Sequence, residues 1–114
     1  MRTLIGYKKC STCKAIEKLL EEQGLSYTYR EIDKDVPTAE ELKSWREKTG
    51  LPLKRFFNTS GMKYRELGLK DKLPTMTDEE QFDLLASDGM LIKRPILLEE
   101  DAIYVGPDVK KHLA

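Results

Sequence analysis

The stretch Gly6-Tyr7-Lys8-Lys9-Cys10-Ser11-Thr12-Cys13-Lys14 contains both cysteines of this 114-residue chain, three positions apart. Before it, residues 3–5 are rich in branched side chains and predict a short β-strand. After it, apolar residues recur on one helical face until Gly24 and predict an amphipathic helix. These residues are Ala15, Ile16, Leu19 and Leu20. The two cysteines therefore lie at a turn from a strand into a helix.

This position favours reactive thiol chemistry. A cysteine that precedes a helix lies beside the positive end of the helix dipole and the unpaired N–H groups of the first turn, and both favour the thiolate. Lys8, Lys9 and Lys14 add positive charge nearby. We therefore expect Cys10 to be the nucleophile and to ionise more easily than Cys13. Cys13, one turn further along, is placed to attack a mixed disulfide formed at Cys10.

Three other interpretations of the cysteine pair are open. Buried cysteines can act simply as small apolar side chains, although a strand-to-helix turn that holds both is typical of a thioredoxin-like motif. A structural zinc site normally needs four ligands, and this chain offers one cysteine pair and His112. A structural disulfide would close so short a loop that it would add little stability. We expect no metal and no bound cofactor.

The chain carries no net charge. It has 20 basic and 20 acidic residues and an isoelectric point near 6.6, which argues against a nucleic-acid-binding surface as the main function. No apolar run is long enough to span a membrane, and the amino terminus lacks an apolar signal core. A redox-active cysteine pair suits a reducing compartment, so we expect a cytoplasmic, monomeric protein with a single domain, residues 1–114.

The middle of the chain is helical. Residues 27–32 predict a second strand, and strand, helix and strand in this order form a βαβ unit with parallel strands and a right-handed crossover. Residues 36–88 predict helices and no strand. Two capping boxes, each a threonine followed three residues later by a glutamate, begin helices there: Thr38–Glu41 and Thr77–Glu80. Trp45 is expected in the core.

The carboxy-terminal part predicts a β-hairpin and a last helix. Residues 96–98 and 102–105 are apolar and flank the acidic turn 99–101. Asp108 can cap a short terminal helix. The order of elements is therefore βαβ, a helical block and ββα.

This order predicts an α/β protein with a four-stranded mixed sheet. Residues 1–35 and 89–114 are expected to form the core, because they supply the strands and the first and last helices. Residues 36–88 are expected to be a helical insertion in that core.

The combination of motifs resembles the arsenate-reductase/Spx family. The resemblance rests on Cys10-x-x-Cys13 at the strand-to-helix turn, on the run Leu91-Ile92-Lys93-Arg94-Pro95-Ile96 before the hairpin, and on the helical insertion. Three stretches also resemble the small bacterial members of the YusI type: Phe57-Asn58-Thr59-Ser60-Gly61, Tyr64-Arg65-Glu66-Leu67-Gly68 and Asp88-Gly89-Met90-Leu91-Ile92. The resemblance covers essentially the whole chain and implies a thioredoxin-like (glutaredoxin-like) fold.

The resemblance also implies roles for single residues. Cys10 matches the nucleophile, Arg94 matches an arginine that faces it, and Pro95 matches the thioredoxin-fold proline, usually cis. A guanidinium near Cys10 would stabilise the thiolate and hold an oxyanion or a glutathione carboxylate; the alternative for Arg94 is a surface salt bridge. Thr12 and Pro95 are expected to be structural residues of the site. The implied reductant is glutathione, thioredoxin or glutaredoxin.

Departures from the family's arsenate reductases concern the oxyanion site. Those enzymes hold the oxyanion with three arginines and do not usually carry a second cysteine three residues after the first. Here only Arg94 is retained, and the other two matching positions hold Asn58 and Gly106. Arg55 or Arg65 would have to fill the missing places.

Cys13 resembles instead the redox switch of the Spx regulators, which bind RNA polymerase rather than DNA. Spx proteins are somewhat longer, with a carboxy-terminal extension. Gly50 lies near their polymerase-contacting glycine, but a glycine there also serves as a helix terminator.

Three functions are therefore open. The first is a thiol–disulfide oxidoreductase that uses Cys10 and Cys13. The second is an Spx-like redox-sensing regulator in which the same disulfide alters a surface for RNA polymerase. The third, glutaredoxin-linked arsenate reduction, ranks last because two of the three arginines are absent.

Overall fold

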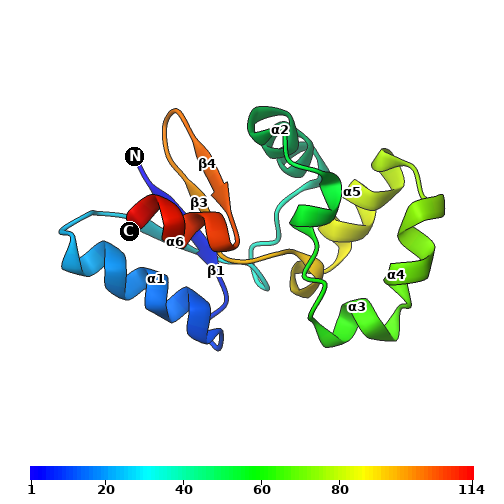
Figure 1. Cartoon of the computed structure of the whole chain (residues 1–114), viewed down its shortest axis with the longest axis horizontal. Coiled ribbons are helices and arrows are strands. Elements are labelled where there is room, and N and C mark those ends of the chain that lie inside the picture. Colours follow the sequence, from blue (N-terminus) through cyan, green and yellow to red (C-terminus); the bar gives the residue numbers. More distant parts are fainter.

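The computed structural model describes the whole chain, residues 1–114, and contains one four-stranded mixed sheet (Figure 1). The strands are β1 (Thr3–Gly6), β2 (Thr28–Glu31), β3 (Ile96–Leu98) and β4 (Ile103–Val105). Their order is β2-β1-β3-β4; β1 is parallel to β2, and the other two pairings are antiparallel. The predicted mixed sheet, with its βαβ and ββα units, is confirmed.

Alternation along the strands divides the apolar side chains between two cores. Leu4 and Leu97, paired across β1 and β3, belong to the core that α1 (Ser11–Glu22) and α6 (Pro107–Leu113) cover. Ile5 and Ile96 belong to the core on the opposite face, which the helical block covers. All four side chains are fully buried. The cysteine turn, which leads from β1 into α1, is thus held by a central strand and a packed helix.

Residues 36–88 form a block of helices beside the sheet (Figure 1). Both predicted capping boxes are present and begin α2 and α5, and Trp45 is buried as expected. Helix α2 packs on α5 and also contacts β4. The elements of the block are α2 (Ala39–Thr49), α3 (Met62–Glu66), α4 (Leu69–Lys72), α5 (Asp78–Ser87) and the 3-10 turns η1 (Leu53–Phe56) and η2 (Leu73–Thr75).

The helical block is joined to the core by backbone hydrogen bonds next to the predicted site. The Asn58 N–H donates to the Leu91 carbonyl at 2.8 Å, and the Lys93 N–H donates to the Phe56 carbonyl at 2.8 Å. This short pairing fixes the loop that begins at Asn58 alongside the segment that leads to Arg94. The block therefore lies beside the segment that carries Arg94.

Gly89 allows a close backbone approach where the chain leaves the helical block. It opens the turn η3 (Gly89–Leu91), and a side chain there would overlap the carbonyl oxygen of Ile32. Only glycine fits such a backbone contact. The chain can therefore pass from the block back into the sheet directly against the end of β2.

Element ends differ slightly from the prediction. Strand β2 begins at Thr28 rather than at Tyr27, whose hydroxyl donates to Glu17 at 2.9 Å. Helix α1 ends at Glu22, two residues before Gly24. None of the helices combines the length and the apolar character that a membrane span requires.

Candidate redox site

Cys10 occupies the N-cap position of α1. Its backbone is extended (φ −93°, ψ 119°), its N–H donates to the Tyr7 carbonyl at 2.9 Å, and its carbonyl accepts the Lys14 N–H at 3.1 Å. No side chain caps the helix. Cys10 is half-buried, Cys13 is fully buried, and both are free thiols. The turn thus presents one accessible sulfur and keeps the second behind it.

The surroundings of Cys10 favour its thiolate. Burial raises the pKa of Cys10, but the Cys13 backbone N–H, the Cys13 thiol and the Arg94 guanidinium together bring it below the ordinary value. The N–H of Cys13 is one of the first-turn donors that a helix leaves without an internal partner. Hydrogen bonds to the charged form of a group stabilise that form.

Cys13 is in the opposite situation. Burial, together with the neighbouring Cys10, raises the pKa of Cys13 to about 12, although a hydrogen bond from the Tyr7 backbone N–H acts against this rise. Cys13 is therefore a thiol at neutral pH and donates to Cys10. The expected order of acidity, Cys10 before Cys13, is the order in this structure.

Arg94 is the cation at Cys10. The Arg94–Pro95 peptide bond is cis, as expected, and Arg94 contributes both a hydrogen bond and a favourable charge to the Cys10 thiolate. The guanidinium carbon lies 5.1 Å from the centroid of the Tyr7 ring. Its Nε and Nη1 atoms are buried and have no hydrogen-bond partner. Arg94 is thus no surface salt bridge, and these two donor atoms have no partner in the protein.

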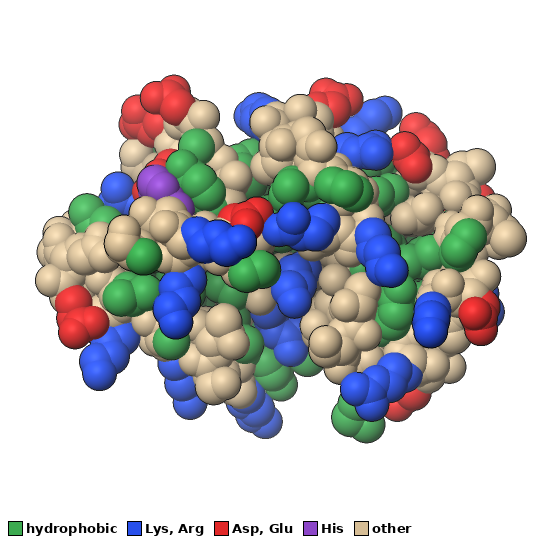
Figure 2. All heavy atoms as spheres, viewed as in Figure 1, with side chains coloured by type: hydrophobic (Ala, Val, Ile, Leu, Met, Phe, Trp, Pro, Cys, Tyr) green, Lys and Arg blue, Asp and Glu red, His purple; other side chains and the backbone are tan.

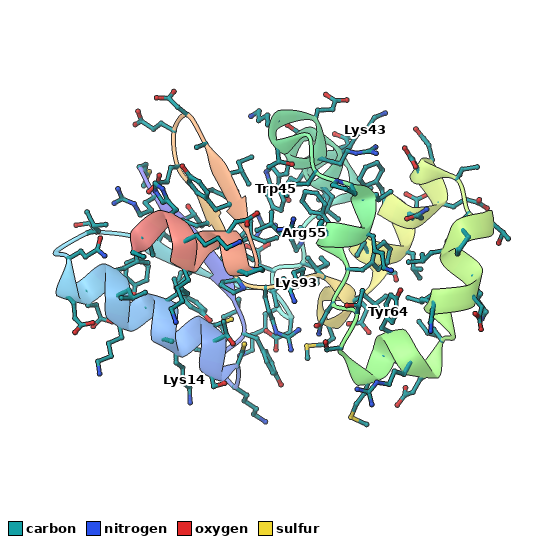
Figure 3. The ribbon with its side chains drawn as sticks, in the orientation of Figure 1. Lys14, Lys43, Trp45, Arg55, Tyr64 and Lys93 are labelled. Carbon is teal, nitrogen blue, oxygen red and sulfur yellow. The ribbon has the colours of Figure 1, made fainter.

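The lysines of the turn act less directly than expected. The largest favourable influences on Cys10 come from Cys13 and Arg94 rather than from lysines. The Lys8 ammonium lies 4.0 Å from the centroid of the Tyr29 ring, and Lys14 extends outward from α1 (Figure 3). The charge of Lys8 is thus placed over Tyr29 of β2, and no lysine is among the groups that shift the pKa of Cys10. Thr12, expected as a structural residue of the site, is exposed.

The positions that match the other two arginines of the resemblance carry no charge toward Cys10. Asn58 lines a groove with Arg94, whereas Gly106 is covered by the stem of Lys93, whose Cε would lie 3.0 Å from a Cβ at that position. Arg55 is held away by an ion pair with Asp108, with 2.8 Å between Nη2 and Oδ2. Lys and Arg side chains gather along the middle of the visible face (Figure 2), and Lys93 and Arg55 lie there where the two halves meet (Figure 3).

An open groove of about 690 Å³ lies beside Arg94. The Asn58 loop, the start of α3 and Met90 form its sides. Arg65 is exposed on α3 and is not one of its lining residues. Because Arg94 lines this groove, a molecule bound there would contact the Arg94 side chain.

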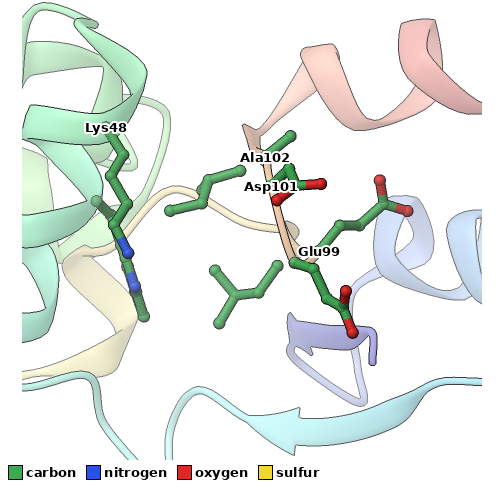
Figure 4. A pocket seen from close by; sticks show the side chains of 8 residues that line it. Lys48, Glu99, Asp101 and Ala102 are labelled. Carbon is green, nitrogen blue, oxygen red and sulfur yellow. The ribbon is translucent and has the colours of Figure 1, made fainter.

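A second cavity, of about 500 Å³, lies between α2 and the tip of the β3–β4 hairpin. Figure 4 shows Lys48 on one side and the acidic turn with Glu99 and Asp101 on the other. Neither cysteine lines it. It is separate from the redox site.

His112 is not part of the cysteine site. Its Nε2 lies 3.0 Å from Glu99 Oε1, and its ring stacks on Tyr104 with 3.9 Å between centroids. No three side chains of the His, Cys, Asp and Glu types come together in a group that could hold a metal ion.

Two tyrosines at the site were not anticipated from the sequence. Tyr7 supplies a backbone carbonyl to Cys10, a backbone N–H to Cys13 and a ring face to Arg94. The Tyr29 hydroxyl is buried close to Cys13. Tyr7 stands in the cysteine stretch itself, but Tyr29 comes close only through the parallel pairing of β1 and β2.

Sequence comparison relates the chain to known proteins. The sequence profile of the ArsC family matches residues 5–113. The uncharacterised protein YusI of Bacillus subtilis is 54% identical over 104 residues, which are 91% of this chain and 88% of YusI. The global transcriptional regulator Spx 1 of Bacillus cereus is 26% identical over 106 residues, which are 93% of this chain and 79% of that protein.

Solved structures agree with this relation. A protein related to the ArsC family from Bacteroides fragilis superposes with a TM-score of 0.91 at 49% identity, covering 99% of this chain and 97% of its own. An arsenate reductase from Vibrio cholerae gives a TM-score of 0.85 at 26% identity, with 96% and 92% covered. The predicted thioredoxin-like fold and the resemblance to the arsenate-reductase/Spx family are confirmed.

Proposed function

Because this chain belongs to the ArsC family, we propose that it is a thiol–disulfide oxidoreductase with Cys10 as nucleophile and Cys13 as resolving cysteine. The observation that supports this most is the contrast between two free thiols one helical turn apart. The pKa of Cys10 is lowered, and the pKa of Cys13 is raised. Cys10 therefore reacts first, and Cys13 keeps its proton until an adduct has formed.

The reaction runs in two exchanges. The Cys10 thiolate attacks one sulfur of a substrate disulfide, the substrate S–S bond breaks, and the released thiolate takes up a proton. Cys13 then loses its proton to water and attacks the Cys10 sulfur. The second substrate thiol leaves, and a Cys10–Cys13 disulfide remains. Glutathione, thioredoxin or glutaredoxin supplies the two electrons that restore both thiols.

Arg94 has two roles in this cycle. Before the first exchange it stabilises the Cys10 thiolate. Once that sulfur is in a mixed disulfide and carries no charge, the buried Nε and Nη1 donors stay without a protein partner. A carboxylate of the bound substrate, such as that of glutathione, then satisfies them in a charge-assisted hydrogen bond. The groove at Asn58 is the path by which such a group approaches.

Trapping tests the proposal directly. A Cys13→Ser variant should accumulate mixed disulfides at Cys10, because the second exchange has lost its nucleophile. Incubation with a cell extract, followed by non-reducing electrophoresis and mass spectrometry, identifies the trapped molecules. The matched control is Cys10→Ser, which should trap nothing. Equal trapping by both variants would contradict the assigned order of the cysteines.

A redox-sensing regulator is the second candidate, favoured by the similarity to Spx 1. In that case the Cys10–Cys13 disulfide would change a protein surface, and RNA polymerase would be the partner. Gly50 is no argument for it, because its φ of +67° ends α2 and itself accounts for a glycine. Capture of RNA polymerase subunits by the wild type and by both cysteine variants alike would favour the regulator over the enzyme.

Arsenate reduction is the third candidate. The Vibrio cholerae relative supports it through its fold. The site offers one unpaired arginine instead of the three that the family resemblance implies, so we rank it last.

A further inference from the structure

Tyr29 carries a buried polar group that the two exchanges above do not use. Its hydroxyl oxygen is inaccessible to solvent and has no hydrogen-bond partner. The neighbouring Tyr27, by contrast, donates its hydroxyl to Glu17 at 2.9 Å. Buried hydroxyls in folded proteins are nearly always paired, because an unpaired one loses its bonds to water without replacement. The unpaired hydroxyl of Tyr29 therefore requires an explanation.

Gly6 shows what the Tyr29 hydroxyl faces. A Cβ built on Gly6 would lie 2.7 Å from that oxygen and 3.1 Å from the Cys13 sulfur. The phenol and the thiol therefore border the same small space, which stays open because residue 6 has no side chain. Nothing else in the structure donates to or accepts from the hydroxyl. The Cys13 sulfur is the reactive atom that borders this space together with the hydroxyl.

We propose that Tyr29 is a further catalytic residue, whose O–H donates a hydrogen bond to the Cys13 sulfur as that sulfur becomes a thiolate in the second exchange. This inference rests on the proposed function. The Cys13 proton leaves to water, the S–S bond to Cys10 forms, and the departing substrate thiolate takes up a proton. The phenol stays neutral throughout, so the balance of the exchange is unchanged.

Cys13 needs such a donor more than Cys10 does. Burial raises the pKa of Cys13 to about 12, and the Tyr7 backbone N–H is the one backbone donor that favours its thiolate. A preorganised donor has its largest effect where charge develops away from water. Burial, and then the charge that Cys13 can carry, raise the pKa of Tyr29 well above its usual value. The phenol therefore keeps the proton that it donates.

Lys8 strengthens this donor. Its ammonium lies 4.0 Å from the centroid of the Tyr29 ring, where a positive charge draws electron density from the phenol and makes its O–H a better donor. The other ionisable groups that act on Tyr29 come from the cysteine turn, from α1 and from β2: they are Cys10, Cys13, Glu17 and Glu31. Both glutamates are common to the wild type and the variants below, so their effect on a pH profile cancels.

The test is the two-phase reaction of the reduced protein with a nitrophenyl disulfide whose released thiolate is coloured. Attack by Cys10 releases the first coloured thiolate, and attack by Cys13 on the resulting adduct releases the second. Tyr29→Phe keeps the ring and removes the hydroxyl. We expect its first phase to match the wild type, its second phase to be about 10- to 100-fold slower, and the pH midpoint of that phase to rise. Lys8→Gln should slow the second phase by a smaller factor.

Tyr27→Phe is the matched control, because it removes a hydroxyl that bonds to Glu17 and not to a cysteine; it should leave both phases unchanged. A Tyr29→Phe variant with a second phase of wild-type rate and midpoint would overturn the role of Tyr29 and leave the proposed function intact. Equal slowing of both phases, the mark of lost packing, would also overturn that role. Release of a single coloured thiolate by the wild type would overturn the proposed function together with this inference.

Discussion

Two arginines that lie partly inside the molecule meet opposite surroundings. Arg30 on β2 forms two hydrogen bonds with the Glu41 carboxylate, at 2.8 and 2.9 Å, and its Nε lies 3.4 Å from Asp35 Oδ2. Arg94 at the cysteine turn has no carboxylate, and two of its donor atoms are buried and unpaired. Carboxylates neutralise the charge of Arg30, because an uncompensated buried charge lowers the stability of the fold. The charge of Arg94 is therefore available to the Cys10 thiolate and to an incoming anion.

The largest expected effect tests whether Arg94 alone is enough for the reduction of arsenate. We expect the protein to reduce arsenate poorly. Arsenate resembles phosphate, with a charge of about −1.5 to −2 near neutral pH, and needs several fixed donors. If each missing arginine costs about 2.7–4 kcal/mol, as the loss of one oxyanion-hole donor can, two losses slow the reaction by roughly four to six orders of magnitude.

The assay compares arsenate with a glutathione mixed disulfide, using glutathione and glutaredoxin or thioredoxin as reductants. The second substrate should turn over much faster. Rapid arsenate turnover that disappears in Cys10→Ser and in Arg94→Ala would show instead that Arg65 or a lysine supplies the missing charge. Arg55 would first have to leave Asp108.

The next effect separates the two arginines by reactivity. In a Cys13→Ser background, Arg94→Ala should slow the alkylation of Cys10 at neutral pH about 10- to 100-fold, because the pKa of Cys10 rises when the cation is lost. Arg30→Ala in the same background should react at the unchanged rate. Alkylation rates measured against pH give both values. Similar rates in the two variants would remove Arg94 from the site.

For the free energy of unfolding, we expect the reverse order: Arg30→Ala should have the larger effect and Arg94→Ala the smaller one. Arg30→Ala should lower the free energy of unfolding by about 1–2 kcal/mol, because it removes charge-assisted hydrogen bonds between β2 and α2. Arg94→Ala should change it by less than about 0.5 kcal/mol, since Nε and Nη1 have no protein partner and the hydrogen bond that is lost is the one to the half-buried Cys10. Urea titrations followed by circular dichroism measure both. A larger loss in Arg94→Ala would give Arg94 a structural role.

The sequence predicts most of this arrangement where the information is local or repeated. Hydrophobic periodicity and capping boxes are properties of short segments, and they give the elements in their correct order. The parts that the sequence does not predict are contacts between distant segments. Tyr29 reaches Cys13 through the register of β1 and β2 and the absent side chain of Gly6.

The sequence also does not predict which basic side chains act at the redox site. Lys8, adjacent to the cysteines in sequence, lies over the Tyr29 ring instead of acting first on Cys10. Arg55 is engaged by Asp108, 53 positions away. Side-chain direction and long-range pairing decide which cation acts at the site, and neither can be predicted from composition or spacing.

The smallest expected effect is the pH dependence of the stability that the Arg30–Glu41 pair provides. Hydrogen bonds from Arg30, and more weakly from Thr38, hold the pKa of Glu41 at about 2 against the opposing effect of burial. A carboxyl whose pKa is lower in the folded than in the unfolded chain stabilises the fold above its unfolded pKa, near 4.3. It loses that contribution as pH falls toward 2. Because the Glu41 side chain is 37% exposed, solvent screens the interaction, and we expect a loss of about 1 kcal/mol. Glu41→Gln should be less stable than the wild type by that amount at pH 6, and the difference should shrink steadily in urea titrations between pH 4.5 and 2.

A difference that stays constant over this range would mean that the Arg30–Glu41 contact depends on hydrogen-bond geometry and not on charge. Cys10 alkylation should be the same in both proteins, because this ion pair and the redox site do not share a charged group.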